Sequence, residues 1–269
     1  MSEIQVFQRK VSAYYSKHAR RFPWRETRDP YRILVSEVML QQTQVNRVVE
    51  KYGEFLKTFP TVRSLAVAEL ARVIRAWQGL GYNRRALYLK RAAEIVVEKY
   101  GGHIPRSEMK LRELPGVGPY TAAAVSLFAY NTPTVLIETN IRSAFIHHFF
   151  QRRKKVRDSE ILPLISDAFP RRNPRQWYQA LMDYGAYVKR VYKNPGRRSV
   201  HHIRHPPFRG SNREVRGAIV RLLAEKKMQE RELTRCLWAD RERTRENLLR
   251  LTQEGLVRKR SGVYEIASS

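Results

Sequence analysis

The sequence predicts an all-α protein with a small additional domain at its C-terminal end. Apolar residues recur every three or four positions through about the first 200 residues, a spacing typical of helices that bury one face. No convincing alternation of period two interrupts this pattern. The composition agrees with a folded protein, because 42% hydrophobic and 10% aromatic residues in a chain of 269 suffice for a packed core.

The predicted helices can be placed in order along the chain. The first helix is expected to begin after Ser2, a favourable N-cap residue, and to bury Phe7 and Val11. The segment Phe22–Trp24 interrupts the pattern, and Pro30 suits the first turn of the next helix. The remaining helical pattern lies in the ranges 31–55, 61–77, 84–100, 107–114, 119–130, 140–150, 159–169 and 176–191.

The C-terminal residues form a different pattern. Helices are predicted at 212–225, 230–238 and 240–254, and residues 256–266 alternate around Ser261-Gly262, as in a β-hairpin. Three helices and a hairpin are typical of a winged-helix domain, with a small stabilising appendage as the alternative. The predicted parts are a helical region (1–195), a basic linker (196–207) and a winged-helix domain (208–269).

Charge identifies the expected class of partner. The chain has 52 Lys and Arg against 25 Asp and Glu, a net charge of +27. Such a surplus favours a polyanion, and nucleic acid fits better than a membrane surface because the charge is scattered along the whole chain. No apolar run is long enough for a membrane span, and the first residues lack the apolar stretch of a signal peptide, so a cytoplasmic, nucleoid-associated protein is expected.

Cysteine content limits the cofactors. Cys236 is the single cysteine of the sequence, so neither a disulfide framework nor a four-cysteine zinc or iron–sulfur site can form within this chain. His201, His202 and His205 offer a possible zinc site, but histidines in a basic loop without a nearby carboxylate are more often solvated or near phosphate. The sequence therefore predicts no metal and no cofactor.

The sharpest local motif is LPGVGPYTAA, residues 114–123. Gly116 and Gly118 allow a tight turn between two helices, and their missing side chains let backbone N–H groups approach an anion. The start of the second helix favours negative charge at the same place. The motif predicts a helix-hairpin-helix that binds a phosphate group.

With this motif, the chain resembles the helix-hairpin-helix superfamily of base-excision DNA glycosylases, and within it the adenine glycosylase (MutY) branch. The resemblance covers roughly residues 20–192 and implies a two-lobed helix-hairpin-helix glycosylase fold, with a barrel lobe (about 24–132) and a second lobe (1–23 plus 133–195). The segments that carry it are FPWRETRDPYRILVSEVMLQQTQV (22–45), QGLGYNRRA (78–86), LPGVGPYTAA, IETNIRSA (137–144) and LMDYGA (181–186).

The resemblance implies catalytic roles for particular residues. Glu37 matches the acid that protonates the departing base and handles the attacking water, and its apolar neighbours suit a carboxyl of raised pKa. Glu138 stands where the family has an aspartate that stabilises or captures the sugar cation, and Asn140 matches an asparagine of the family. Tyr120 stands where lyase relatives carry a Schiff-base lysine. By default, Glu37 would be an ordinary surface or buried helix residue.

The resemblance also implies contacts with DNA. Gln41 and Gln42 match a loop that enters the duplex beside the extruded nucleotide, and Tyr82 matches an aromatic residue wedged at the mismatch. By default, the glutamines would be solvated and Tyr82 would pack in the core. The remaining expected DNA contacts are the hairpin glycines Gly116 and Gly118 and the basic residues Arg84, Arg197 and Arg198.

The chain departs from the family pattern at three places. Glu138 is longer than aspartate by one methylene, about 1.5 Å, and misplacement of that size can cost roughly a hundredfold in rate; we expect a repositioned backbone to preserve activity. A basic stretch, residues 187–205, replaces the four-cysteine loop of most relatives. The predicted winged helix replaces a larger β-rich domain, which leaves the recognition of oxidised guanine open.

The sequence therefore predicts a monomeric, monofunctional DNA glycosylase that acts on double-stranded DNA with a mismatched or damaged base, and has no membrane partner. Adenine opposite guanine or oxidised guanine is the expected substrate. A thymine or uracil mismatch glycosylase of the same superfamily is one alternative, and a catalytically silent DNA-binding protein is another. Tyr120 is a phenol and cannot form an imine, so no lyase activity is expected.

Overall fold

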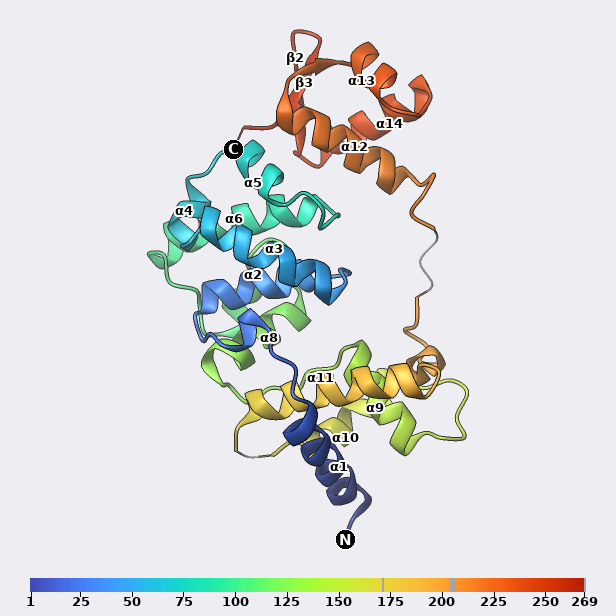
Figure 1. Ribbon diagram of the computed structural model, residues 1–269. Coiled ribbons are helices and arrows are strands. Elements are labelled where there is room, and N and C mark those ends of the chain that lie inside the picture. Colours follow the sequence, from blue (N-terminus) through green and yellow to red (C-terminus); the bar gives the residue numbers. More distant parts are fainter. Residues whose placement is uncertain (171, 204–206, 269) are drawn as a thin grey trace. The chain divides into compact units, whose positions relative to one another are not determined.

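The computed structural model describes residues 1–170, 172–203 and 207–268, which are mainly helical (Figure 1). They divide into two compact units. Unit 1 consists of Met1–Pro30 and Pro119–His205, and unit 2 consists of Tyr31–Gly118 and Pro206–Ser269. His205 and part of the predicted basic linker lie outside the described residues.

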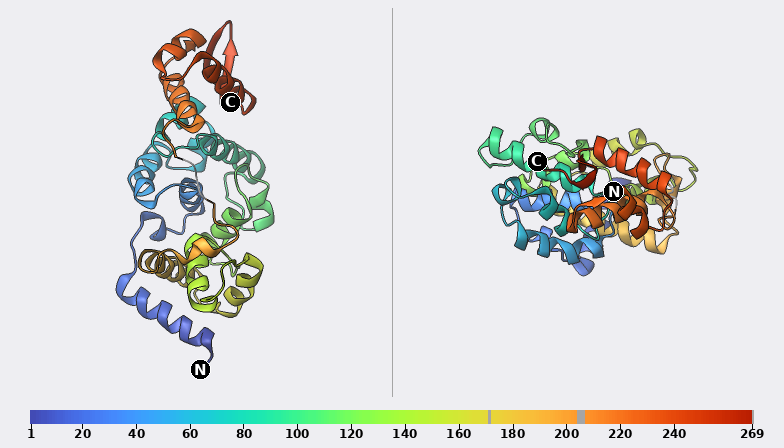
Figure 2. Two further views of the ribbon diagram at one scale, coloured as in Figure 1. Left: turned by 90° about the vertical axis from the view of Figure 1, so that its right-hand side faces the viewer. Right: turned by 90° about the horizontal axis from the view of Figure 1, so that it is seen from above.

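Unit 1 is built around the packing of α9 (Thr139–Phe149) against α11 (Pro174–Val191). Gly185, in α11, has no side chain where α11 meets α9, and a Cβ there would come within 2.1 Å of the Asn140 carbonyl oxygen. Phe7, in α1, packs its ring 4.8 Å from that of Phe145. In Figure 1 and Figure 2, α1 lies beside α11, which it contacts. The elements are α1 (Glu3–His18), η1 (Pro23–Arg25), α8 (Pro119–Tyr130), α9 (Thr139–Phe149), α10 (Asp158–Asp167), α11 (Pro174–Val191) and η2 (Pro195–Arg198).

A buried ion pair fixes the N-terminal segment to α11. Asp183 is 1% exposed, and its carboxylate accepts hydrogen bonds from the Arg20 Nε at 2.6 Å and from both terminal nitrogens of Arg25 at 2.8 and 2.9 Å. Two guanidinium groups offset the cost of burying one carboxylate. The segment between α1 and α2 therefore belongs to unit 1.

The helices of unit 2 pack around α6. Trp77 and Phe55 are fully buried, with ring centroids 5.7 Å apart, and α6 contacts both α4 and α5. Lys90 is also buried, and its ammonium group donates to the Ala66 carbonyl oxygen. The elements before the hairpin are α2 (Pro30–Leu40), α3 (Val45–Thr58), α4 (Val62–Ala66), α5 (Leu70–Ala76), α6 (Arg84–Tyr100) and α7 (Glu108–Arg112).

The C-terminal residues of unit 2 combine helices with a small antiparallel sheet whose strand order is β1-β3-β2. Val257 pairs with Ile266, and the hairpin turns at Ser261 and Gly262, whose positive φ values of 49° and 79° suit a two-residue turn. The assignment of these residues to the winged-helix class stays a prediction. The elements are α12 (Asn212–Glu225), β1 (Met228–Gln229), α13 (Glu230–Cys236), α14 (Arg241–Gln253), β2 (Val257–Arg260) and β3 (Val263–Ile266).

Several predicted elements differ in detail from those observed. The pattern at 31–55 is divided by a turn at residues 41–44, and the pattern at 61–77 is divided between α4 and α5. Strand β1 was not predicted. The first residues of the predicted linker form η2, which packs on α9, and Val156 bridges to Ser199, so these residues belong to unit 1.

The predicted lobes also group residues differently from the two compact units. Residues 119–132 lie in unit 1 and not with the rest of the predicted barrel lobe, because α8 packs on α11. The predicted domain borders stay predictions. None of the helices in the described parts of the chain combines the length and apolar character of a membrane span.

The replacement Asp183→Asn tests the ion pair of unit 1. It leaves two guanidinium groups without their carboxylate, so we expect the free energy of unfolding to fall by about 3–5 kcal/mol. The measurement is urea unfolding followed by circular dichroism. The control is Asp167→Asn at the exposed end of α10, and an equal effect of the two replacements would contradict the assignment.

Candidate DNA-binding and catalytic site

One buried guanidinium organises the end of α2 and the start of α6. Arg85 is 8% exposed, and its Nη1 donates to the carbonyl oxygens of Val38, Met39 and Gln41 at 2.7–2.8 Å. Its Nη2 donates to the carbonyl oxygens of Leu80 and Gly81 at 2.9 and 3.0 Å. The same side chain thus joins two segments, which we name the Gln loop (residues 41–44) and the Tyr loop (residues 78–83).

The charge of Arg85 is stabilised mainly by peptide dipoles. The carbonyl groups of Val38 and Met39 lie in the last turn of α2, where the negative end of the helix dipole favours a cation. The guanidinium carbon also lies 5.4 Å from the ring centroid of Trp77 and 5.6 Å from that of Tyr82. Burial lowers the pKa of Arg85 to about 10, so the group stays charged at neutral pH.

The two loops present residues in a sparsely populated backbone conformation. Gln42 has φ of 54° and Tyr82 has φ of 48°, both in the left-handed region that a side chain disfavours. Arg85 binds the carbonyl group immediately before each of them, those of Gln41 and Gly81. Gln42 is exposed, and Tyr82 retains 42% of its accessible surface. Arg85 therefore holds two exposed side chains in fixed positions.

The Gln loop also contacts the hairpin. The Gln41 Nε2 donates to the Gly116 carbonyl oxygen at 3.3 Å. Gly116 has φ of 76°, and a Cβ there would lie 2.9 Å from the Cβ of Tyr88, so this turn requires glycine. At Gly118, by contrast, a Cβ would meet no described atom within 4 Å. The hairpin therefore needs Gly116 for its conformation, whereas Gly118 leaves open space in front of the backbone.

Glu37 lies on α2, one turn before the end of the helix. It is 7% exposed, and its neighbours Ser36 and Val38 are buried as well. A carboxyl group in such a setting is largely removed from bulk water. Glu37 belongs to unit 2, together with the Gln loop and the Tyr loop.

Glu138 caps the N-terminus of α9. Its Oε1 accepts from the backbone N–H groups of Asn140 and Ile141, both at 2.8 Å. Its Oε2 accepts from the Asn140 Nδ2 at 3.2 Å and from the Thr139 hydroxyl at 3.1 Å. Both carboxylate oxygens are thus fixed at the helix end that favours negative charge, and the structure brings Glu138 and Asn140 together. Tyr120 lies half-buried in the first turn of α8, also in unit 1.

Two of the basic residues expected at DNA make contacts within the protein. Arg198 donates from Nη1 to the carbonyl oxygens of Phe150 and Gln151 at 2.6 and 2.8 Å, and thereby satisfies acceptors where α9 ends. Arg84 forms an ion pair with Glu254. Arg197, by contrast, is exposed. The structure therefore gives Arg84 and Arg198 structural contacts that the sequence did not predict.

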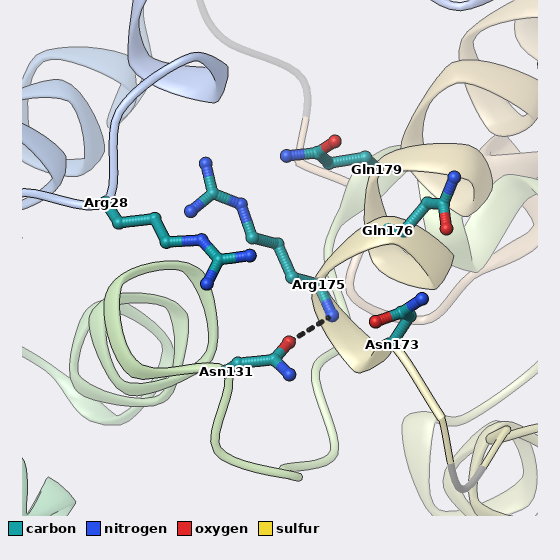
Figure 3. Close-up of a pocket in the computed structure, with 6 residues that line it drawn as sticks. All are labelled: Arg28, Asn131, Asn173, Arg175, Gln176 and Gln179. Carbon is teal, nitrogen blue, oxygen red and sulfur yellow. Dashed lines mark hydrogen bonds between the residues drawn. The ribbon is translucent and has the colours of Figure 1, made fainter.

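Unit 1 also contains an open polar hollow of about 270 Å³ (Figure 3). The Arg175 backbone N–H donates to the Asn131 Oδ1 at 3.3 Å, and its guanidinium donates to the carbonyl oxygens of Phe128 and Thr27. Burial and the positive charge of Arg28 lower the pKa of Arg175. The arrangement ties the N-terminal segment to α8 and α11. The lining residues are Arg28, Asn131, Asn173, Arg175, Gln176 and Gln179.

The described residues contain no cluster of His, Cys, Asp and Glu suited to a metal ion. The His201 Nε2 lies 3.9 Å from a carboxylate oxygen of Asp158, and His205 lies outside the described residues. Burial and the Arg142 guanidinium act in opposite directions on Asp158, and its pKa is lowered on balance.

The replacement Arg85→Lys tests the connection between the two loops. Lysine has a single ammonium group in place of the planar guanidinium, so it cannot bind the carbonyl groups of both loops at once. Both loops should therefore become more mobile. We expect the free energy of unfolding to fall by about 1–3 kcal/mol. Hydrogen–deuterium exchange of residues 41–44 and 78–83 should become faster, and Arg91→Lys, at an exposed position of the same helix, serves as the control. Unchanged exchange in both loops would contradict this role.

Comparison with known proteins places this geometry in a family. The family model described as "HhH-GPD superfamily base excision DNA repair protein" matches residues 35–163. An adenine DNA glycosylase of Buchnera aphidicola subsp. Baizongia pistaciae is 31% identical over 189 residues, which cover 70% of this chain and 54% of the relative. That of Mycolicibacterium smegmatis is 38% identical over 176 residues, covering 64% and 59%. The chain thus spans little more than half the length of these relatives.

A solved structure gives the same result for the fold. A thermostable thymine-DNA glycosylase superposes with a TM-score of 0.61 at 27% identity, covering 68% of this chain and 86% of that one. The predicted helix-hairpin-helix glycosylase fold is therefore confirmed. The matched region, residues 35–163, includes α2 with Glu37, both loops, the hairpin and α9. Residues 35–163 of this chain are thus an HhH-GPD domain, the domain of a superfamily of base excision DNA repair proteins, and adenine DNA glycosylases are among the relatives of the chain.

Proposed function

We propose that this chain is a monofunctional DNA glycosylase that removes a mismatched base from double-stranded DNA by hydrolysis. The observation that carries the proposal is the arrangement around Arg85. The buried carboxyl group of Glu37 lies on α2, and Arg85 binds carbonyl groups in the last turn of that helix. The two loops that Arg85 joins carry Gln42 and Tyr82, which are exposed and have a strained backbone. Adenine opposite guanine or oxidised guanine is the proposed substrate, supported by the adenine glycosylase relatives.

Binding of the duplex follows from charge and shape. The net charge of +27 favours association with the phosphate backbone, and the hairpin at Gly116 and Gly118 offers backbone N–H groups to one phosphate. A base cannot be cleaved inside the stack, so the nucleotide must rotate out of it. Gln42 and Tyr82 are suited to fill the space that the nucleotide leaves in the stack, because both side chains are exposed and Arg85 binds the carbonyl group that precedes each of them.

The chemistry is a hydrolysis in which Glu37 moves the proton. Glu37 donates its proton to the five-membered ring of the base, and the bond between that base and the sugar breaks with its electron pair going to the base. The developing positive charge on the sugar is stabilised by the Glu138 carboxylate. Water then adds to the sugar carbon and returns a proton to Glu37. The products are the released base and an abasic site in an intact strand.

The capping contacts of Glu138 support the proposal that glutamate acts here in place of aspartate. The bonds from the Asn140 and Ile141 N–H groups draw its carboxylate back onto the start of α9, and the additional methylene is taken up in this folded conformation. Because both carboxylate oxygens accept hydrogen bonds, the Glu138 side chain has little rotational freedom and its carboxylate has a defined position. We therefore retain Glu138 as the charged group near the sugar and Asn140 as the residue that orients it.

Two other functions remain as outcomes of the test. Removal of thymine or uracil is favoured by the likeness to the thymine-DNA glycosylase. A DNA-binding protein without catalysis is the second. In each case the proposed partner is duplex DNA, which a monomer binds in the cytoplasm, in association with the nucleoid. Residues 208–269 are proposed to form a winged-helix domain.

The deciding experiment uses duplexes with one defined mismatch and alkali to cleave abasic sites. Wild-type protein should produce alkali-labile sites at adenine opposite guanine or oxidised guanine. Glu37→Gln should lower the rate by at least about a hundredfold, because general acid catalysis contributes about 10²–10⁴-fold, while duplex affinity changes only a few fold. Glu50→Gln, at an exposed position of α3, is the control. Turnover by Glu37→Gln at the wild-type rate would exclude Glu37 as the acid, and cleavage only at thymine or uracil would replace the substrate.

A second experiment tests the absence of lyase chemistry. Tyr120 starts α8 with a phenol, which cannot form a Schiff base with the sugar aldehyde. We expect no protein–DNA adduct after borohydride treatment, and intact strands until alkali is added. Tyr120→Lys should produce a trapped adduct, whereas Tyr130→Lys, at the other end of α8, should not. An efficient adduct with the wild-type protein would show that another amine acts.

A further inference from the structure

The C-terminal part of unit 2 packs directly on the helices that carry the Tyr loop. In Figure 1, α12 lies above α5, and the two helices are in contact. The Arg75 guanidinium, on α5, donates to the Ala224 carbonyl oxygen at 2.6 Å, where α12 ends. Trp77 and the Tyr loop follow α5 directly in the chain. The C-terminal residues therefore contact the segment from which Tyr82 projects.

A carboxylate bridge fastens the same surfaces. Glu254, at the C-terminal end of α14, accepts from the Arg216 Nη2 of α12 at 2.6 Å and pairs with Arg84, the first residue of α6. Its side chain is 17% exposed, so water screens this bridge less than a surface pair. Burial alone would raise the pKa of Glu254, but the two guanidinium groups lower it on balance, so the bridge is present at neutral pH.

The bridge aligns α12 with the Tyr82 side chain. Arg213 lies in the first turn of α12, and its Nη1 donates to the Tyr82 hydroxyl oxygen at 3.1 Å. Tyr82 is thus held at two points. Arg85 binds the carbonyl group before it and lies under its ring, and Arg213 binds its hydroxyl group. The first of these contacts comes from the glycosylase region and the second from the C-terminal residues.

We propose that the C-terminal residues 207–268 position the Tyr82 side chain through Arg213, and so take part in distinguishing mismatched from matched DNA. The inference rests on the proposed role of Tyr82 at the mismatch. Arg213 is a positioning residue, because it acts through the Tyr82 hydroxyl group. Glu254 supports it indirectly, by keeping α12 fixed against the start of α6.

A double-mutant cycle tests this proposal. The variants are Tyr82→Phe, which removes only the hydroxyl group, Arg213→Met, and the two together. The quantity measured is the ratio of dissociation constants for matched and mismatched duplexes at fixed salt, by fluorescence anisotropy. A hydrogen bond of about 0.5–1.5 kcal/mol corresponds to a loss of about 2- to 12-fold in this ratio for each single variant. Because both remove the same contact, the double variant should lose no more than either single one.

The control is Arg221→Met, at an exposed position of the same helix. It removes the same charge and corrects for the general loss of affinity, so it should weaken matched and mismatched binding equally. Glu254→Gln is a second test, because it removes the charge that pairs with Arg84 and Arg216 and keeps α12 fixed against the start of α6. It should lower the ratio in the wild-type background and change nothing further in Tyr82→Phe.

The outcomes separate this inference from the proposed function. Additive losses in the cycle, or equal behaviour of Arg213→Met and Arg221→Met, would overturn the inference while base excision by the wild type stands. A wild-type protein that distinguishes mismatches without excising any base would overturn the proposed catalysis alone, and the cycle would still decide the role of Arg213. A wild-type protein that binds matched and mismatched duplexes equally would overturn the inference alone, because base excision is measured separately.

Discussion

The structure of the candidate site depends on the burial of one positive charge. Arg85 donates hydrogen bonds to carbonyl groups of two loops that lie about forty residues apart in the chain. Only the guanidinium group of arginine offers this many donors in one plane. Buried carbonyl groups need partners, so the loops can close around this group and not without it. The backbone at Gln42 and Tyr82, the end of α2 and the start of α6 are consequences of the same set of hydrogen bonds.

Unit 1 uses the opposite charge in a comparable way. Asp183 is buried between Arg20 and Arg25, and two residues later Gly185 brings α11 against the carbonyl group of Asn140. One turn of α11 therefore fixes the N-terminal segment on one side and the start of α9 on the other. The position of Glu138 follows from this packing, because its carboxylate is bound to the first N–H groups of α9.

The sequence was sufficient where the signals were local. The ranges predicted for two helices, 119–130 and 84–100, are those of α8 and α6, which begin at Pro119 and end before Gly101, and Ser261-Gly262 predicted the hairpin turn. The turn at residues 41–44 contains neither glycine nor proline, and it is imposed by a side chain distant in sequence. Local rules therefore could not predict it.

The different roles of the neighbouring residues Arg84 and Arg85 were not predicted from the sequence either. Arg84 and Arg85 are adjacent and chemically identical, but one pairs with Glu254 and the other is buried. The signal that distinguishes them is position on α6: Arg85 shares a face with Leu89 and Ala92, at spacings of four and seven, and both are buried. For Arg198 no such signal exists, because its acceptors are carbonyl groups at the end of another helix.

The left-handed backbone at Gln42 and Tyr82 bears on how quickly such a protein can examine DNA. Each residue with this backbone conformation lowers the stability of the fold by about 1–3 kcal/mol, and the hydrogen bonds of Arg85 offset that loss when the protein folds. In the proposed function these loops meet a base pair, and because little further ordering is then needed, the entropic part of the barrier to insertion is small. A rigid probe of this kind is suited to brief encounters with many base pairs in succession, because each encounter can end without a slow rearrangement of the protein.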